Sequence, residues 1–382
     1  MEKTVYFLGA GFSADAGGPI QNDIIKFILK ENFDLIFNEE KDILKAKKSF
    51  INFIRKDLLI PKNLWPEISL EDVFTPIDRS LSNGKSFKNY DVKELVNLRE
   101  SFHLLMGAAI NYGLDYSKKS KQYIDQFASF IDSVAKQRLE DISKDQISII
   151  TTNWDLLVDN ALNKLVKKFS ENEQINNRKR LAVVDYCCYI SSLEDDEFIK
   201  PGLLALGRGG YNIKYLKLHG SMNWLHCPNC QRMYIKYNEK TMLIHNKYYC
   251  KHCAKNFKIN KTNAIKLTSN LLLPTFIKDL SNIQIQLVWQ NAAIELSEAT
   301  KVVFIGYSLP SADFEIRQLL SRSIPNHASI EIIIYPGSSG NKTQEQLSKD
   351  IQWYKSFFGK RIKDDSSFIV KTVPEYIKSL NL

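Results

Sequence analysis

Two Cys-x2-Cys motifs separated by 19 residues constrain this chain more than any other feature. Cys227 and Cys230 form the first pair, and Cys250 and Cys253 form the second. Each pair turns tightly enough for both sulfurs to reach one ion, and two pairs complete a tetrahedron of thiolates. Since this leaves no ligand position for water, the pattern predicts a small module folded around a structural zinc ion.

Two alternatives to a four-cysteine site stay open. A histidine could replace one cysteine as a ligand, and the candidates are His226, His245 and His252. The two pairs could also be reduced buried thiols or a redox pair without metal. The other cysteines, Cys187 and Cys188, are expected in the core, and this usage is typical of a metal site in a reducing compartment. We therefore expect a cytoplasmic protein.

Composition excludes several classes of protein. The chain has 382 residues, of which 44% are hydrophobic and 25% charged, as in ordinary globular proteins. No apolar run approaches the ~20 residues of a membrane span, and the first residues lack the pattern of a signal peptide. We therefore expect no membrane association.

The net charge of +9 is concentrated around the cysteine pairs. Residues 227–266 contain one acid, Glu239, and nine basic residues: Arg232, Lys236, Lys240, Lys247, Lys251, Lys255, Lys258, Lys261 and Lys266. Such a surface could contact nucleic acid or an acidic partner. The simpler interpretation, which we favour, is a solvated face of a small module.

The first strand is expected at residues 4–8 and leads into a glycine-rich turn. Gly9, Gly11, Gly17 and Gly18 follow an apolar run without alternation, which is typical of a buried parallel strand. A helix beginning at about Ser13 would direct its free N–H groups toward a phosphate. The third glycine of a complete dinucleotide motif is displaced, so a plain strand–turn–helix corner is the alternative.

Residues 20–145 are expected to form an α-helical insertion between the first and second strands of the sheet. Apolar positions recur there at helical spacing, and Ser69 and Asp72 have the spacing of a capping box. Nothing in this region has catalytic spacing.

The second strand, at residues 146–150, ends in the motif Thr-Thr-Asn-Trp-Asp. Polar side chains at the carboxyl end of a parallel strand lie where α/β sheets bind ligands. Asn153 could orient a ribose hydroxyl or a water molecule, because its amide both donates and accepts hydrogen bonds. The alternative is that Asn153 or Asp155 caps the following helix.

The rest of the chain continues the alternation of strands and helices. We expect a glycine-rich loop at residues 202–210, a strand ending in Leu-His-Gly at residue 220, a helix at 283–297 and a strand at 301–305. That strand ends in Gly306-Tyr-Ser308-Leu-Pro, and Asp313 starts another helix. A strand at 329–337 and a helix at 345–359 follow.

These elements predict an α/β fold with a Rossmann-like parallel sheet, a large α-helical insertion and a small four-cysteine zinc module. The Rossmann-like domain would comprise residues 1–19, 146–226 and 267–382. The insertion would comprise residues 20–145, and the zinc-binding module residues 227–266.

Four predicted strand ends carry glycine or polar motifs in a defined order. They are GAGFS, TTNWD, LHG and GYSL, and the four-cysteine pattern follows LHG. This order resembles the sirtuin family of NAD-dependent enzymes, which has GAGxS, TQNxD, HG, two Cys-x2-Cys pairs and GxS. The resemblance covers residues 5–18 and about 147–336, and leaves out the helical insertion.

The resemblance implies a role for each matched residue. NAD would be bound, from the pyrophosphate to the adenosine side, by Gly9, Ala10, Gly11, Ser13, Thr152, Gly306 and Ser308. The catalytic positions at the nicotinamide ribose would be Asn153, Asp155 and His219, with His219 as general base. Zinc would be held by Cys227, Cys230, Cys250 and Cys253.

The chain also departs from the protein deacylases of that family. The segment after the first glycine turn lacks the Asp-Phe-Arg of their GIPDFR motif, and Tyr335-Pro336 stands where they usually carry an Asn for the adenosine ribose. The helical insertion, the SLEDVF stretch and the SLPSAD loop resemble more the sirtuin-like proteins of bacterial anti-phage defence.

The resemblance therefore implies an NAD⁺ hydrolase that releases nicotinamide and ADP-ribose and acts in defence by depleting NAD. One alternative is an NAD-dependent protein deacylase or ADP-ribosyltransferase, and another is a non-catalytic NAD- or nucleic-acid-binding subunit. The resemblance also implies a homo-oligomer and a HerA-like ATPase partner.

Overall fold

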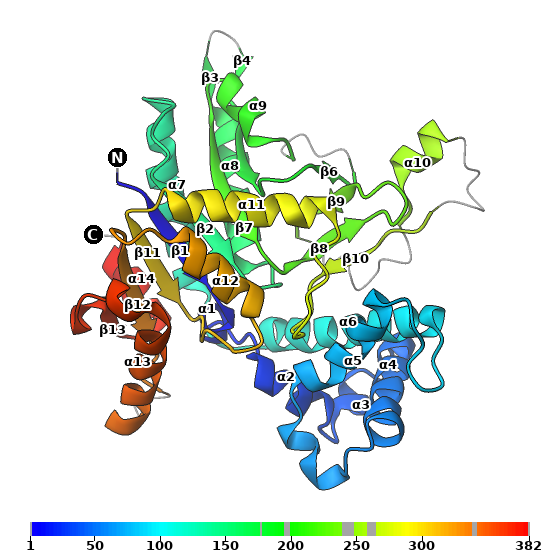
Figure 1. Ribbon diagram of the computed structural model, residues 1–382. Coiled ribbons are helices and arrows are strands. Elements are labelled where there is room, and N and C mark those ends of the chain that lie inside the picture. The colour runs from blue at the N-terminus through cyan, green and yellow to red at the C-terminus, as the bar shows by residue number, and fades with distance from the viewer. Residues whose placement is uncertain are drawn as a thin grey trace.

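The computed structural model describes residues 2–175, 178–194, 199–238, 248–257, 265–337 and 342–380. Its centre is a parallel sheet of seven strands in the order β13-β12-β11-β1-β2-β7-β5 (Figure 1). In chain order these are β1 (Thr4–Leu8), β2 (Ile147–Thr151), β5 (Ala182–Asp185), β7 (Tyr211–Lys217), β11 (Lys301–Ile305), β12 (Ser329–Ile334) and β13 (Phe368–Val370). The Rossmann-like α/β fold predicted from the sequence is confirmed.

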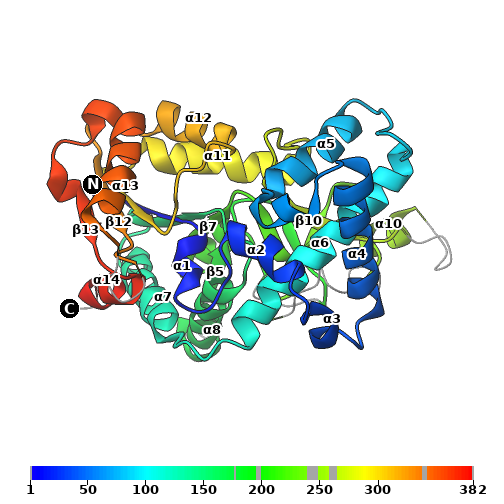
Figure 2. The same ribbon diagram turned by 90° about the horizontal axis from the view of Figure 1, so that it is seen from below.

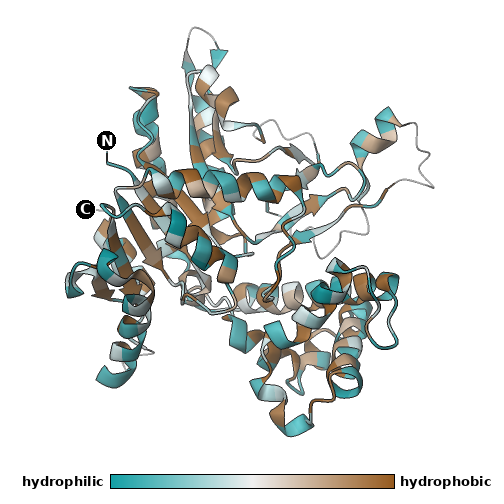
Figure 3. Cartoon of the chain, in the orientation of Figure 1, coloured by the Kyte–Doolittle hydropathy of each residue, from teal (hydrophilic) through white to brown (hydrophobic). Residues whose placement is uncertain are grey.

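Helices cover both faces of this sheet (Figure 2). One face carries α7 (Gln122–Ala135), α8 (Leu157–Asn172) and α14 (Val373–Leu380), and the other carries α11 (Ile283–Ser297) and α12 (Phe314–Ser323). Because both faces are covered, β1 and β2 are buried along almost their whole length. The apolar strands and the hydrophilic outer helix faces are visible in Figure 3.

Further helices and strands complete the part of the chain that surrounds the parallel sheet. They are α1 (Ala10–Ala14), η3 (Lys136–Leu139), β3 (Gln174–Ile175), β4 (Arg178–Lys179), α9 (Gly202–Gly207), α13 (Gln344–Phe358), η7 (Gly359–Arg361) and η8 (Asp365–Ser367). The prediction of a loop at residues 202–210 was wrong, because α9 lies there. Leu203, Leu204 and Ala205 favour a helix, and Ala205 is buried in a small cluster with Leu181 and Val183 beside β5.

A group of helices, α2–α6, lies to one side of the sheet (Figure 1). It contains α2 (Gln21–Ile28), α3 (Phe33–Ile36), α4 (Lys41–Asn52), η1 (Phe53–Asp57), η2 (Lys62–Glu67), α5 (Leu70–Ser82) and α6 (Val92–Asp115). We call residues 21–115 the helical unit. Phe102 packs edge-on against Phe50, Phe53 and Phe74 inside it, which gives this unit apolar packing of its own.

A capping box marks the start of α5 inside the helical unit, as the sequence predicts. Ser69 and Asp72 form the expected capping box at the start of α5, with the Ser69 Oγ accepting from the Asp72 amide at 3.1 Å. The last helix of the predicted insertion, α7, packs against α8, β2 and β7 rather than within the helical unit. The proposed division of the chain at residues 20 and 145 stays a prediction.

A second sheet of four strands lies next to the side of the first sheet at which the parallel strands end. Its order is β10-β8-β9-β6, with β6 (Ile190–Ser192), β8 (Gly220–His226), β9 (Met233–Ile235) and β10 (Thr268–Leu271). β8 follows β7 after two residues, so the chain passes directly from the parallel sheet into this second sheet, in which β8 is antiparallel to β9 and β10 and β6 is parallel to β9. The short helix α10 (Lys251–Asn256) lies beyond β9.

Candidate functional site

The four motifs at the predicted strand ends come together at one edge of the parallel sheet. They follow β11, β1, β2 and β7, which are consecutive neighbours in the sheet. Because all four strands are parallel, their carboxyl ends lie on the same side. The strand order reverses next to β1, which is the position where open α/β sheets bind ligands. We call this region the carboxyl edge.

The first glycine turn packs tightly against the turn after β11. The Gly11 amide donates to the Gly306 carbonyl at 2.8 Å, and Gly9 donates to Ile305 at 3.0 Å. A Cβ on Gly9 would lie 2.5 Å from the Tyr307 Cα, and one on Gly306 would lie 2.1 Å from the Phe12 nitrogen. Only glycine allows this approach of two backbones.

Helix α1 differs from its prediction in position. It begins at Ala10 and not at about Ser13, because the glycine turn closes within one residue of β1. Ala10 is exposed, whereas Ser13 is buried. The N–H of Gly11 and the hydroxyl of Ser13, both predicted to contact a pyrophosphate, make hydrogen bonds within the protein.

Asn153 and Asp155 lie beside Ser13 at the carboxyl edge. Asn153 Nδ2 donates to the Gly9 carbonyl at 2.9 Å and to Ser13 Oγ at 3.2 Å, and the Ser13 hydroxyl donates to Asp155 Oδ2 at 2.7 Å. Asn153 Oδ1 is buried and has no hydrogen-bond partner among the described residues. Buried carbonyl oxygens normally have partners, so this unpaired atom is a position where a ligand hydroxyl could donate.

The TTNWD motif is held in place by the adjoining strands. The Thr152 amide donates to the Leu8 carbonyl at 3.1 Å, so this predicted NAD-contacting residue is tied to the end of β1. Asp155 Oδ1 accepts from the Leu157 amide at 3.0 Å, but the N-cap position of α8 is Leu156, so neither Asn153 nor Asp155 is the N-cap that the alternative expected.

His219 lies where the chain leaves the parallel sheet and enters the four-stranded sheet. Gly220 follows it with φ of 74°, and a Cβ there would lie 2.1 Å from the Asn270 carbonyl oxygen. This glycine therefore fixes the sharp bend that turns His219 toward the site. His219 is 6% exposed, and within the described part of the chain its Nε2 has no hydrogen-bond partner.

Burial lowers the pKa of His219 to about 4. The Asp313 carboxylate and a hydrogen bond with the Thr152 backbone raise it, while the Lys278 ammonium lowers it further. The imidazole is therefore neutral across physiological pH, and the lone pair of an unpaired nitrogen can accept a proton.

The remaining predicted residues lie at the outer part of the edge. Ser308 is exposed and Gly306 is partly exposed, while Tyr307 between them is buried. The structure therefore brings together the segments that carry all the residues predicted to bind NAD and to act in catalysis. Their roles stay predictions.

Sequence reasoning missed three charged residues in this region. Lys217 is fully buried, with its Nζ 2.7 Å from the Asp155 carbonyl and 2.7 Å from Asp159 Oδ2. Lys278 and Asp313 form an ion pair at 3.0 Å beside His219. A lysine inside the apolar run that precedes Leu-His-Gly was the signal that could have identified Lys217.

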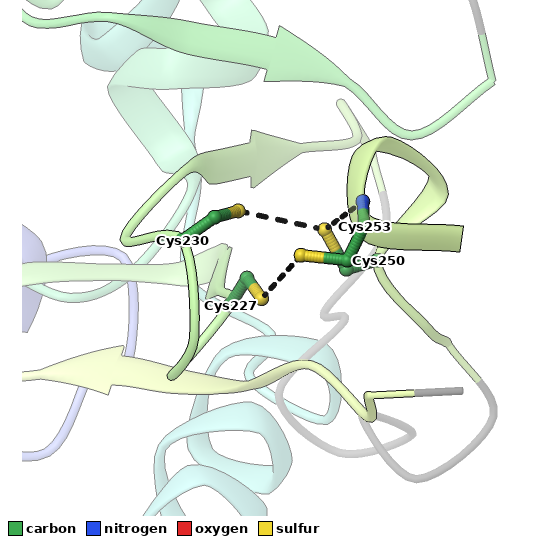
Figure 4. A group of neighbouring side chains, drawn as sticks. All are labelled: Cys227, Cys230, Cys250 and Cys253. Atoms are coloured by element: carbon green, nitrogen blue, oxygen red, sulfur yellow. Dashed lines mark hydrogen bonds between the residues drawn. The ribbon is translucent and has the colours of Figure 1, made fainter. Parts of the chain in front are cut away.

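The four cysteines form a group that could hold a metal ion (Figure 4). Cys227 and Cys230 lie on the turn between β8 and β9, whereas Cys250 and Cys253 lie at the start of α10. The Sγ–Sγ distances are 3.7 Å for Cys227–Cys253 and for Cys230–Cys250. Tetrahedral zinc with Zn–S bonds of about 2.3 Å requires sulfurs about 3.8 Å apart, so the group fits zinc.

The histidine alternative gains no support in the described part of the chain. His226 lies 3.3 Å from the Thr268 hydroxyl, and neither His226 nor His252 belongs to the cysteine group. His245 lies outside the described residues. Of the predicted basic surface, Glu239, Lys240, Lys247, Lys258 and Lys261 are also outside them, so its shape is not described.

Among the described residues, no helix is both long enough and apolar enough to span a bilayer. Cys187 and Cys188 are partly buried against the main core, and desolvation there raises the pKa of both thiols.

Comparisons with known proteins give low similarity. No protein-family model matches the chain, and no curated protein matches it. Solved structures of sirtuins are similar over nearly the whole chain. One, on sirtuin substrate affinity, has a TM-score of 0.39 and 14% identity, covering 99% of this chain and 92% of that chain.

Two further solved structures give similar values. A mutant of a Sir2 homologue in complex with ADP-ribose has a TM-score of 0.37 and 12% identity, covering 99% of this chain and 90% of that chain. Sir2Tm bound to a propionylated peptide has a TM-score of 0.37 and 12% identity, covering 99% and 91%. Scores of this size do not place the chain in a family, so the proposal below rests on the motifs and the site geometry.

Proposed function

We propose that this chain is a sirtuin-like NAD⁺ hydrolase that cleaves the bond between nicotinamide and ribose. The observation that carries the proposal is the meeting of GAGFS, TTNWD, LHG and GYSL at one sheet edge, where several buried polar atoms have no hydrogen-bond partner among the described residues, including two on the predicted catalytic side chains. These two atoms are Asn153 Oδ1 and His219 Nε2. They are an acceptor and a base of the kind that a ribose and an attacking water molecule require.

The reaction fits the chemistry of these two side chains. The bond between C1′ and the pyridinium nitrogen breaks, and its electron pair neutralises the departing nicotinamide. Water adds its oxygen to C1′, and its proton passes to His219 Nε2. Asn153 would accept a hydrogen bond from a ribose hydroxyl and so orient the sugar while positive charge develops on it.

The observed arrangement also indicates what must change when NAD binds. Ser13, Asn153, Asp155 and His219 are each less than 10% exposed, and the Gly11 amide is already paired. We infer that the first glycine turn moves and exchanges its internal hydrogen bonds for bonds to the ligand. A partner protein or an oligomeric contact could supply that movement, which is consistent with the predicted homo-oligomer and HerA-like ATPase partner.

The absence of the Asp-Phe-Arg motif and the SLPSAD form of the last loop favour a hydrolase over a deacylase. The resemblance to defence proteins extends the proposal to an effector that depletes NAD in bacteria. Zinc in the four-cysteine module would have a structural role, because all four ligand positions are cysteines. Nucleic-acid binding by the basic residues stays a separate prediction.

The test is chromatographic quantification of nicotinamide and ADP-ribose from NAD, first without peptide and then with an acylated peptide. Equal amounts of both products without peptide, and none from Asn153→Ala, are expected. Nicotinamide release only with the peptide, together with acyl-ADP-ribose, would instead identify a deacylase. Salt-sensitive nucleic-acid binding with no nicotinamide under either condition would favour a non-catalytic subunit.

A further inference from the structure

Asp313 occupies the N-cap position of α12 without acting as a cap. Its side chain makes no capping hydrogen bond, although aspartate at this position usually accepts one from the helix. The carboxylate instead points toward three groups from other segments. His219 Nε2 lies 3.7 Å from Oδ1, Lys278 Nζ lies 3.0 Å from Oδ1, and the Tyr307 hydroxyl donates to Oδ2 at 3.0 Å.

Lys278 contacts both the Asp313 carboxylate and the backbone next to it. Its side chain is fully buried, and its Nζ also donates to the carbonyls of Thr275 and Ala312 at 3.3 Å. Ala312 directly precedes Asp313, so Lys278 holds the backbone as well as the carboxylate. Burying an ion pair is costly unless further hydrogen bonds surround it. The hydrogen bonds of Tyr307 and the two carbonyls meet this requirement.

We infer that Asp313 is a positioning residue for His219 and that Lys278 tunes it. The Asp313 carboxylate, 3.7 Å from Nε2, stabilises by its charge the imidazolium that forms when Nε2 takes the proton of the attacking water. Lys278 offsets part of the carboxylate charge, so His219 remains neutral until the reaction begins. This inference rests on the proposed function, because it assigns His219 the role of base.

The groups that face His219 predict in which direction each substitution moves the pKa of its imidazole. They are the Asp313 carboxylate from the start of α12, the Lys278 ammonium from the segment before α11, and the Thr152 backbone after β2. Tyr307 acts through Asp313. Asp313 and Lys278 act on the imidazole in opposite directions, so removing one charge at a time must move its titration in opposite directions.

The test combines the variants Asp313→Asn, Lys278→Met and the double variant with the pH profile of kcat/KM for NAD. Lys278→Met is expected to move the acid limb upward by about one pH unit. Asp313→Asn should move it downward and lower kcat by roughly 100-fold with little change in KM. The double variant should return the limb toward that of the parent. Asp313→Glu should recover part of the lost kcat.

A titration of His219 that does not depend on activity separates this inference from the proposed function. NMR of ¹³C-labelled histidine, assigned with His219→Gln, should give a higher pKa for His219 in Lys278→Met than in the parent. If that shift occurs without any NAD cleavage, the proposed function fails but the coupling stands. If the three variants fold, judged by circular dichroism, and neither titration nor pH limb moves, the inference is overturned.

Discussion

The carboxyl edge of the parallel sheet and its amino edge, where the strands begin, differ in how their buried polar atoms are paired. Toward the amino edge, Lys3 contacts Asp145 at 3.1 Å, Glu295 at 2.8 Å and Glu298 at 2.7 Å. Lys214 also pairs with Asp145 and Glu295. At the carboxyl edge, no residue that the structure describes forms a hydrogen bond with Asn153 Oδ1 or His219 Nε2.

This difference distinguishes buried groups that the fold explains from buried groups that could bind a ligand. The three carboxylates toward the amino edge lie close enough together to hold a cation, but Lys3 already contacts all of them. Their charges are explained by the fold alone. The unpaired atoms at the carboxyl edge are not, and buried polar groups without partners are uncommon unless they meet a ligand.

The largest effect is expected from removing zinc, because the four-cysteine module is connected to the carboxyl edge of the parallel sheet and not to its amino edge. Free energies on the order of 10 kcal/mol couple zinc binding to folding in such modules. The parent should therefore contain one zinc per chain, and Cys250→Ser should lose it. Mass spectrometry of the metal content measures this, with Cys188→Ser as the matched control that retains zinc.

The link between the module and the site can be measured in the same proteins. β8 begins beside His219, and the Leu272 amide after β10 donates to the His219 carbonyl at 3.0 Å. Loss of zinc should therefore reduce NAD cleavage as well. A zinc-free protein with the nicotinamide release of the parent would show that the module and the site are independent.

The next effect is expected for the unpaired atoms themselves. Asn153→Ala and His219→Ala should each lower NAD cleavage by about 10²- to 10⁴-fold, because each removes an acceptor or base that has no substitute nearby. Nicotinamide release measures this effect. Glu298→Gln, at the amino edge, is the control and should stay within about twofold of the parent. If Glu298→Gln lost as much NAD cleavage as the other two variants, the distinction between the two edges would not hold.

Substituting each of two lysines on β7 compares how much the ion pairs at the two edges contribute to the unfolding free energy. Lys217→Met leaves Asp159 buried without its cation and should cost about 3–5 kcal/mol of unfolding free energy. Lys214→Met should cost less, about 1–2 kcal/mol, because Lys3 still contacts Asp145 and Glu295. Urea denaturation of both variants gives the comparison. A reversed order would mean that the buried pair beneath the site contributes little.

The last effect is a pH dependence of stability. The folded-state pKa of His219 is about 4, below its ordinary value of 6.5, so the unfolded chain binds the proton first as the pH falls. The free energy of unfolding should thus decrease between pH 6.5 and 4, by up to about 3 kcal/mol. His219→Gln should show a shallower decrease in urea denaturation at pH 7.5 and 5. Parallel curves would place the imidazole in contact with water.

The parts of the fold that sequence could predict follow from local patterns. Apolar runs placed β1, β2 and β11, and the motifs after them were expected to share one edge because parallel strands end on the same side. The cysteine spacing gave the module. Helix α9 was missed because glycines at both ends of Leu-Leu-Ala-Leu obscured a single helical turn.

The electrostatics of the site could not be predicted in the same way. Asp313 and Lys278 are separated by 34 residues and meet only through folding of the segment before α11. The sequence identified Asp313 as the start of a helix, but its carboxylate serves His219 and not the helix. Burial of His219, which sets its pKa, likewise depends on long-range packing.

The most direct test locates NAD on the protein by hydrogen–deuterium exchange, using His219→Gln to prevent turnover. A shallow cavity of about 210 Å³ between β11, β12 and η8, lined by Lys301, Arg361 and Lys363 among others, is the rival position for a ligand with phosphates. We predict that NAD slows exchange in residues 8–18, 151–156 and 306–313. Slower exchange only in residues 329–331 and 361–367, or in neither region, would contradict an NAD site at the carboxyl edge.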